Sequence, residues 1–143
     1  MTVPDTSVLI AGFDSAHPFF SLAEAALAEV REGGRLVAHT IAETFAVLSA
    51  PGGPYPAMPE DVLAYLEPLL EADPIGIAPA AYPAAVSELT SAGVTGAAVY
   101  DGLIGLAVRR HDAVLVSLDV RAAPTYRRIG VQFRLLAGPD RPE

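Results

Sequence analysis

The sequence contains no cysteine, no lysine and no long uninterrupted apolar run. Without cysteine the chain has neither a disulfide framework nor a thiolate metal site, and without lysine any mechanism that needs an ammonium group is excluded. Proline, glycine and acidic residues interrupt every apolar stretch well before the roughly 18 residues that suggest a membrane span. The first five residues lack the basic head and apolar run of a secretory signal. We therefore expect a cytoplasmic protein with no membrane span.

Positive charge is also scarce. Nine basic residues, all arginine, stand against 17 acidic residues, which gives a formal net charge of -8. This is the wrong sign for a protein that binds nucleic acid through bulk positive charge. The 143 residues are 52% hydrophobic, enough for a core. With no internal repeat and no interdomain linker, we expect one domain over residues 1–143.

Short apolar segments alternate with amphipathic ones along the chain. Short strands are predicted up to Asp5 and over 35–38, 75–77, 113–117 and 131–134. Helices are predicted over 17–31, 59–70, 81–92 and 96–110. Two more are predicted, one that begins at Thr40 and a short arginine-rich one after Asp119. Thr40 and Thr95 are the expected caps, and 51–56 is an expected loop. This alternation predicts a parallel sheet covered by helices on both faces.

Ligands of such sheets bind outside the carboxyl ends of the strands, and acidic residues stand at two of these ends. Asp5 follows the first predicted strand and Asp119 follows the strand over 113–117. Each also has a structural explanation, Asp5 as a helix N-cap and Asp119 as a cap or turn residue. Glu43 is likewise explained by a capping box with Thr40.

Asp101 is harder to explain by local structure. It lies within 96–106, where almost every neighbour is apolar or small, so we expect a partly buried carboxylate. Burying a carboxylate without a cation is unfavourable. The alternatives are a metal ion and a salt bridge to an arginine in the core.

Together the four acids favour a metal site. Four carboxylates at one sheet edge would repel each other unless cations lay among them. Oxygen ligands favour Mg²⁺ or Mn²⁺ over zinc, particularly with no cysteine and only three histidines. Such ions activate water for attack on a phosphodiester. The acids Asp5, Glu43, Asp101 and Asp119 therefore predict a metal-assisted nuclease.

At this point the sequence resembles a known family. The segments that carry the resemblance are DTSVLI at 5–10, AET at 42–44, YDGLI at 100–104, LVSLD at 115–119 and YRRIGV at 126–131. In this order they are similar to the motifs of PIN domains, and the size and N-terminal start look most like the VapC-type toxins of bacterial toxin–antitoxin pairs.

The resemblance implies a three-layer α/β/α sandwich with a central parallel sheet of about five strands. It implies an endoribonuclease that needs Mg²⁺ or Mn²⁺, forms a homodimer and pairs with a small antitoxin protein. Asp5, Glu43, Asp101 and Asp119 would be the metal-binding and catalytic acids. Ser117 stands where the family commonly has threonine or serine. Some members carry a further acid after the last position, where this chain has Val120 and Arg121, so a second metal would be weakly held or arrive with substrate.

Substrate contacts are expected near the acids. Besides Ser117, the candidates are Arg121, Arg127 and Arg128, which could hold RNA phosphates; a solvated helix face or an antitoxin contact is the alternative. The three histidines lack ligand spacing and are predicted to be non-catalytic.

Several other functions fit less well. A phosphoacceptor receiver domain and many aspartate-nucleophile phosphatases rely on lysine, which is missing, and no Gly-x-Gly-x-x-Gly follows a predicted strand. The remaining alternative is a catalytically inactive PIN-like module that binds another protein.

Overall fold

Three short parallel strands lie at the centre of the molecule. A computed structural model describes residues 1–138, so residues 139–143 of the predicted domain lie outside the described part. Strands β1 (Thr2–Pro4), β2 (Val114–Ser117) and β3 (Phe133–Leu135) pair in the order β1-β2-β3. Because all three run the same way, their carboxyl ends share one edge of the sheet.

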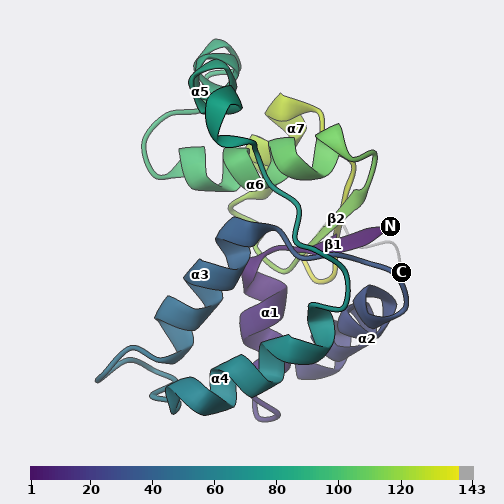
Figure 1. The fold of residues 1–143 in the computed structure, drawn as a ribbon, viewed down its shortest axis with the longest axis vertical. Helices are drawn as coiled ribbons and strands as arrows, with labels where there is room; N and C mark the ends of the chain where they lie inside the picture. Colours follow the sequence, from purple (N-terminus) through teal and green to yellow (C-terminus); the bar gives the residue numbers. More distant parts are fainter. Residues whose placement is uncertain (139–143) are drawn as a thin grey trace.

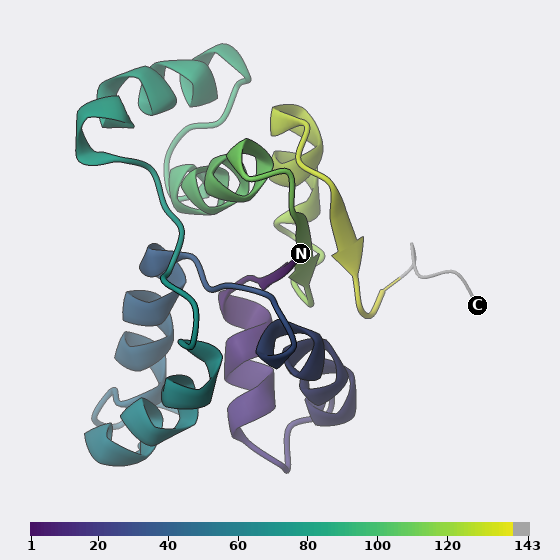
Figure 2. The ribbon, with the colours of Figure 1, turned by 45° about the vertical axis from the view of Figure 1, so that its right-hand side comes forward.

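Helices cover both faces of this sheet (Figures 1 and 2). On one side are α1 (Thr6–Phe13), α2 (Phe20–Arg31), α3 (Ala38–Leu48) and α4 (Pro59–Leu66), followed by the 3-10 turn η1 (Glu67–Leu69). On the other are α5 (Tyr82–Ser91), preceded by the 3-10 turn η2 (Pro79–Ala81), α6 (Ala98–Arg110) and α7 (Ala123–Ile129). Within residues 1–138 no helix is both long and apolar enough to cross a membrane.

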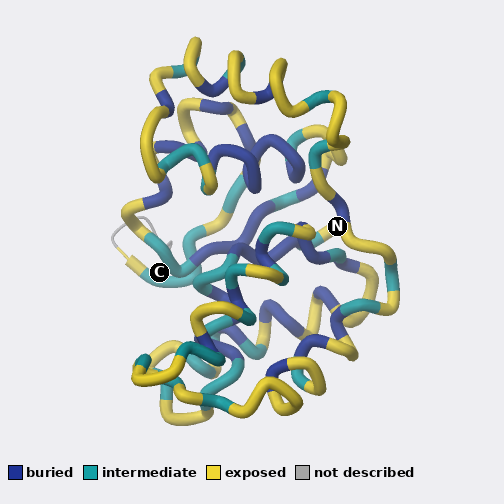
Figure 3. The backbone as a smooth tube through the Cα atoms, turned by 60° about the vertical axis from the view of Figure 1, so that its left-hand side comes forward, coloured by how far each residue is buried: buried dark blue, intermediate teal, exposed yellow. Residues whose placement is uncertain are grey.

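The two faces of β2 belong to two separate cores. Side chains alternate along a strand, so Leu115 packs in the core that includes α6 and α7, while Val116 packs in the core that includes α1, α2 and α4. Both side chains are fully buried. Figure 3 shows that buried residues run through the middle of the molecule and that exposed residues lie at its periphery. The predicted α/β/α sandwich with a parallel sheet is confirmed.

The predicted count of about five strands is wrong for the described residues. The segments predicted as strands at 35–38 and 75–77 form one isolated parallel bridge between Val37 and Ile75. The Ile75 N–H donates to the Leu36 carbonyl at 2.9 Å, and the Ala38 N–H donates to the Ile75 carbonyl at 2.8 Å. No longer ladder forms because α3 begins at Ala38, directly after the bridge.

The predicted caps at Thr40 and Thr95 are also wrong. Helix α3 starts earlier, with Val37 as its N-cap, and the Thr40 hydroxyl inside the helix donates to the Val37 carbonyl at 2.7 Å. The first N–H of α3 is satisfied by Ile75, so no side chain is needed to cap it. Helix α6 likewise has Ala97 as its N-cap. Glu43 is therefore not part of a capping box.

Gly34 sets how closely the chain after α2 passes β1. A Cβ at this position would lie 2.3 Å from the Thr2 carbonyl oxygen and 2.7 Å from the Val30 Cα. Both are backbone atoms, which cannot move aside without displacing β1 or α2. We expect Gly34→Ala to lower the free energy of unfolding by about 2–3 kcal/mol, measured by denaturant unfolding at neutral pH.

Gly76→Ala is the matched control. There the nearest atom to an added Cβ is the Ala38 Cβ at 3.8 Å, an ordinary contact, so we expect an effect between zero and a gain of about 1 kcal/mol. Equal losses in the two variants would show that the close approach at Gly34 does not matter.

Candidate metal centre

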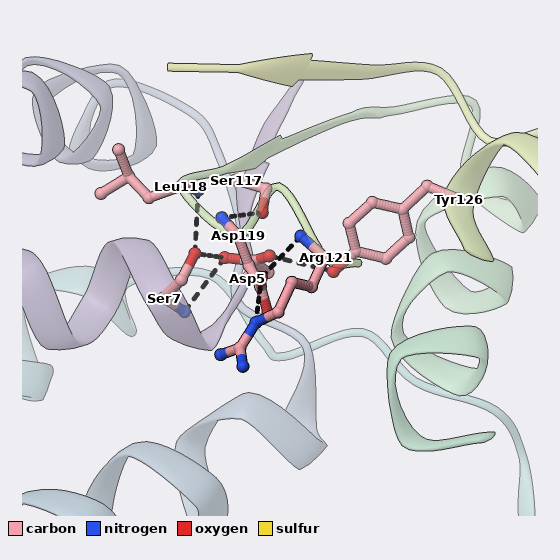
Figure 4. A network of polar contacts seen from close by, with 7 residues as sticks. All are labelled: Asp5, Ser7, Ser117, Leu118, Asp119, Arg121 and Tyr126. Atoms are coloured by element: carbon pink, nitrogen blue, oxygen red, sulfur yellow. Dashed lines mark hydrogen bonds and ion pairs between the residues drawn. The ribbon is translucent and has the colours of Figure 1, made fainter. Parts of the chain in front are cut away.

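Asp5 lies at the junction of β1 and α1, with only 4% of its surface exposed. Its backbone N–H donates to the Val116 carbonyl at 3.0 Å. Its carboxylate oxygen Oδ1 accepts the backbone N–H groups of Ser7 at 3.0 Å and Val8 at 3.4 Å, as well as the Ser7 hydroxyl. Figure 4 shows the contacts between Asp5 and Ser7. The N-cap role considered for Asp5 is therefore real, and it fixes the carboxylate at the sheet edge.

A buried tyrosine holds the second oxygen of the same carboxylate. The hydroxyl of Tyr126, on α7, donates to Asp5 Oδ2 at 2.9 Å (Figure 4). Burial raises the pKa of Asp5, while hydrogen bonds from Ser117, Ser7, Tyr126 and Val8 act in the lowering direction. Burial, followed by the charge of Asp5, raises the pKa of Tyr126, so its hydroxyl stays protonated and remains a donor.

Asp119 follows β2 at the same sheet edge. Its N–H donates to the Ser117 hydroxyl oxygen at 2.9 Å. Its Oδ1 accepts the Arg121 N–H at 2.9 Å and lies 3.7 Å from Arg121 Nε. The Arg121 side chain is 95% exposed, so water screens this ion pair strongly. The turn role considered for Asp119 is present, and its carboxylate still stands beside that of Asp5.

Asp101 lies in the first turn of α6 and is partly buried, as predicted. Burial raises its pKa, and the charges of Asp5, Asp119 and Glu43 raise it further, to about 6. No cation among residues 1–138 contributes an opposing effect, so the described part does not support the alternative of a salt bridge to a core arginine. The other three acids thus lie within electrostatic reach of Asp101.

Glu43 approaches the site from α3. Its Oε1 accepts the Thr6 hydroxyl at 3.0 Å and lies 3.4 Å from His39 Nε2, one turn earlier on the helix. Thr6 begins α1 directly after Asp5, so this hydrogen bond ties Glu43 to the end of β1.

The four acids therefore come from four elements to one edge of the sheet. Within residues 1–138 no group of three or more acidic or histidine side chains is arranged, as it stands, to hold a metal ion. Glu43, Asp101 and Asp119 are partly exposed, so an ion can reach them from solvent. All four supply carboxylate oxygens, the ligands that Mg²⁺ and Mn²⁺ favour. The donor chemistry fits such an ion.

Of the four residues predicted to contact substrate, two lie at the acids and two make contacts elsewhere. Ser117 is fully buried beneath the acids, and Arg121 lies beside Asp119. Arg127 has its guanidinium over the Phe133 ring, 5.7 Å from the centroid, and Arg128 donates to the Gly93 carbonyl at 3.2 Å.

Sequence reasoning missed the residues that support the acids. Ser7, Tyr126 and Thr6 each donate a hydrogen bond to one of the carboxylates. Tyr126 stands 121 positions from Asp5, and no local pattern relates the two. The available signal was that all three residues lie in the segments DTSVLI and YRRIGV, which carry the family resemblance.

Comparison with known proteins identifies the family of the chain. A family model described as the PIN domain matches residues 2–128. Ribonuclease VapC40 from two Mycobacterium tuberculosis strains, CDC 1551 / Oshkosh and ATCC 25618 / H37Rv, is 35% identical over 136 residues, covering 95% of this chain and 99% of the relative. Ribonuclease VapC27 from the H37Rv strain is 34% identical over 102 residues, covering 71% of this chain and 74% of the relative.

A solved structure supports the fold independently. The protein titled "Crystal Structure of FitAcB from Neisseria gonorrhoeae" superposes with a TM-score of 0.68 over 95% of this chain and 98% of that chain, at 20% identity. At that identity the similarity concerns the fold alone. The family match and the VapC40 similarity each span most of the chain. The chain belongs to the PIN-domain family, within which it is similar to the VapC-type ribonucleases.

Proposed function

We propose that this protein is an endoribonuclease that hydrolyses RNA phosphodiester bonds and depends on Mg²⁺ or Mn²⁺. The metal-binding and catalytic residues are Asp5, Glu43, Asp101 and Asp119. The names of the relatives, Ribonuclease VapC40 and Ribonuclease VapC27, support the activity. The observation that carries the metal site is the electrostatic effect of three acids on Asp101.

That effect indicates a site suited to positive charge. Burial is the largest cause of the raised pKa of Asp101, and the charges of Asp5, Asp119 and Glu43 add to it. Arg121, which pairs with Asp119, is almost fully exposed, so water screens its charge. A divalent ion among the acids would reverse the repulsion. Two such ions would bring the formal charge from -8 to -4.

The residues of the site have different roles in this proposal. Asp5 is the rigid ligand, because Ser7, Val8 and Tyr126 hold both of its oxygens. Ser117 positions Asp119 from below through its hydroxyl. A bound ion supplies an activated water and stabilises the leaving oxygen. Glu43 and Asp101 come from separate helices and complete the ligand set.

The proposal also includes arginines outside the acids, which would contact RNA phosphates. Arg121 is placed to reach an RNA phosphate, since its side chain is exposed beside Asp119. Arg127 and Arg128 are candidates for more distant phosphates. From the resemblance to VapC-type toxins, we propose that the protein is the toxin of a toxin–antitoxin pair, forms a homodimer, binds a small antitoxin protein and acts in the cytoplasm.

A cleavage assay separates this function from an inactive binding module. Purified, antitoxin-free protein should cut RNA from a total-RNA pool with Mg²⁺ or Mn²⁺ and stop when the metal is chelated. Protein that binds metal normally yet cuts no RNA would favour the module.

Asp101→Asn tests the site because it should lower RNA cleavage and raise the stability of the metal-free protein. The substitution removes a ligand and a repelling charge while keeping the side-chain shape. We expect RNA cleavage to fall at least about a hundredfold. The free energy of unfolding of the metal-free protein at pH 7 should rise by about 1 kcal/mol, a value discounted for the partial exposure of Asp101. Asp73→Asn, at an exposed loop position, is the matched control and should change neither quantity.

Metal binding is expected to stabilise the folded protein. An ion that binds only the folded state adds about 2.7 kcal/mol at a hundredfold excess over its Kd. Thermal unfolding with and without Mn²⁺ should therefore show a higher midpoint for the wild type and for Asp73→Asn, and little change for Asp101→Asn. An equal shift in all three proteins would place the ion elsewhere.

The metal-free protein should become less stable as pH rises through the weakly acidic range. The pKa of Asp101 is raised from 3.8 to about 6 in the folded state, so the folded protein binds more protons than the unfolded chain between these values. Stability is then greatest below about pH 4 as far as this group is concerned, and is lost as pH rises to about 6. NMR titration of the Asp101 carboxyl carbon checks the pKa, and unfolding at several pH values checks the slope. A pKa near 4 would contradict the proposed crowding of acids.

A further inference from the structure

Tyr100 and His39 form an exposed aromatic pair beside the acids. Tyr100 precedes Asp101 on α6, and 55% of its surface is exposed. Its ring lies parallel to the imidazole of His39 on α3, with an interplanar angle of 0° and centroids 5.5 Å apart. That separation is within the range of an offset stack.

The pair is tied to the acids through His39, whose Nε2 lies 3.4 Å from Glu43 Oε1. Tyr100 stands one position before Asp101 on α6, so the two side chains leave the helix in different directions. The stack with His39 therefore connects α6 with α3 beside Glu43. A group resting on Tyr100 would lie near that carboxylate.

Core packing does not account for this ring. The buried residues of α6 run from Gly102 to Val108, and Tyr100 is in neither hydrophobic core of the described chain. His39 covers one side of the ring, and the exposed fraction of Tyr100 leaves flat apolar surface open to solvent. Such a surface suits a second flat group.

An unpaired nucleobase is the flat group that fits an RNA-cutting site. Splayed-out bases stack on aromatic side chains, and this stacking tolerates any base because each has a π-face. Away from a metal-filled site, the chain's net charge of -8 disfavours phosphates. A contact that does not depend on positive charge is therefore of particular value here.

We propose that Tyr100 stacks on one unpaired nucleobase adjacent to the phosphate that the four acids receive. This inference rests on the proposed ribonuclease function. Tyr100 is a substrate-binding residue, and His39 is a positioning residue that holds the tyrosine ring parallel to its own. Neither takes part in the bond-breaking step, which agrees with the prediction that the histidines are non-catalytic.

The test uses the full chain and a short single-stranded RNA. For Tyr100→Ala, we expect KM for cleavage with Mn²⁺ to rise about thirtyfold, the middle of the range for loss of one stacked base, and kcat to stay within about twofold because stacking contributes uniform binding. Tyr100→Phe keeps the ring and should behave as the wild type. His39→Ala should raise KM about threefold, and His39→Phe should restore it.

Phe19→Ala is the matched control. Phe19 is 41% exposed and also lies beside a histidine, His17, with centroids 6.1 Å apart. It follows the C-terminal end of α1, whereas Asp5 caps the N-terminal end. Its removal should leave KM unchanged.

A binding readout separates failure of this inference from failure of the ribonuclease assignment. A 2-aminopurine base is placed at each position of the RNA in turn, and its fluorescence is measured on binding to an Asp119→Asn background. Quenching at one or two positions that is lost in Tyr100→Ala and kept in Tyr100→Phe supports stacking, whether or not the wild type cuts RNA. If the wild type cuts RNA while Tyr100→Ala has unchanged KM and unchanged quenching, the stacking role is overturned and the nuclease stands. A Tyr100 that instead contacts a protein partner would give this last result.

Discussion

The gathering of four carboxylates at one edge of the sheet is the constraint on which the candidate site depends, and its electrostatic effect is felt at Asp101. Parallel pairing of β1 with β2 brings Asp5 and Asp119 to the same edge, and the flanking helices add Glu43 and Asp101. At Asp101, burial and the charges of the other three acids together raise the pKa. At Asp5, the most buried of the four, burial raises the pKa and the surrounding hydrogen-bond donors act against that effect. A protein that keeps such a cluster at neutral pH gives up some stability, as many functional sites do.

Asp5 shows that a structural role and a role in the site need not be alternatives. One carboxylate oxygen caps α1 through Ser7 and Val8, and the other accepts the Tyr126 hydroxyl. The Ser7 hydroxyl in turn accepts the Leu118 N–H at 2.9 Å, which links the start of α1 to the end of β2. The direction of α1, the pairing of the strands and the position of the carboxylate are thus set together. A carboxylate held in this way is preorganised, because its hydrogen-bond partners fix the direction of both oxygens.

Local patterns predicted some features well and others poorly, and the difference has a physical cause. The helices over Phe20–Arg31 and Ala98–Arg110 follow from apolar periodicity that matches a buried face. The capping box at Thr40 fails because the first amide of α3 bonds to Ile75, a residue far along the chain. The same long-range bridge leaves the expected strands at 35–38 and 75–77 without a ladder. Arg127 and Arg128 looked like neighbours of Arg121, yet their described contacts are with Phe133 and Gly93.

The sequence by itself determined the kind of protein this is: an α/β chain with acids at strand ends, no lysine or cysteine chemistry, and an ordered series of motifs similar to PIN domains. These properties are local or compositional, so they can be recognised without knowledge of the fold. Only the tertiary structure decided which acid is crowded, which is held by a buried tyrosine, and which aromatic ring stands beside them. Hydrogen bonds such as Tyr126 to Asp5 join residues 121 positions apart, and the electrostatic effect of one carboxylate on another depends on distance in space rather than along the chain.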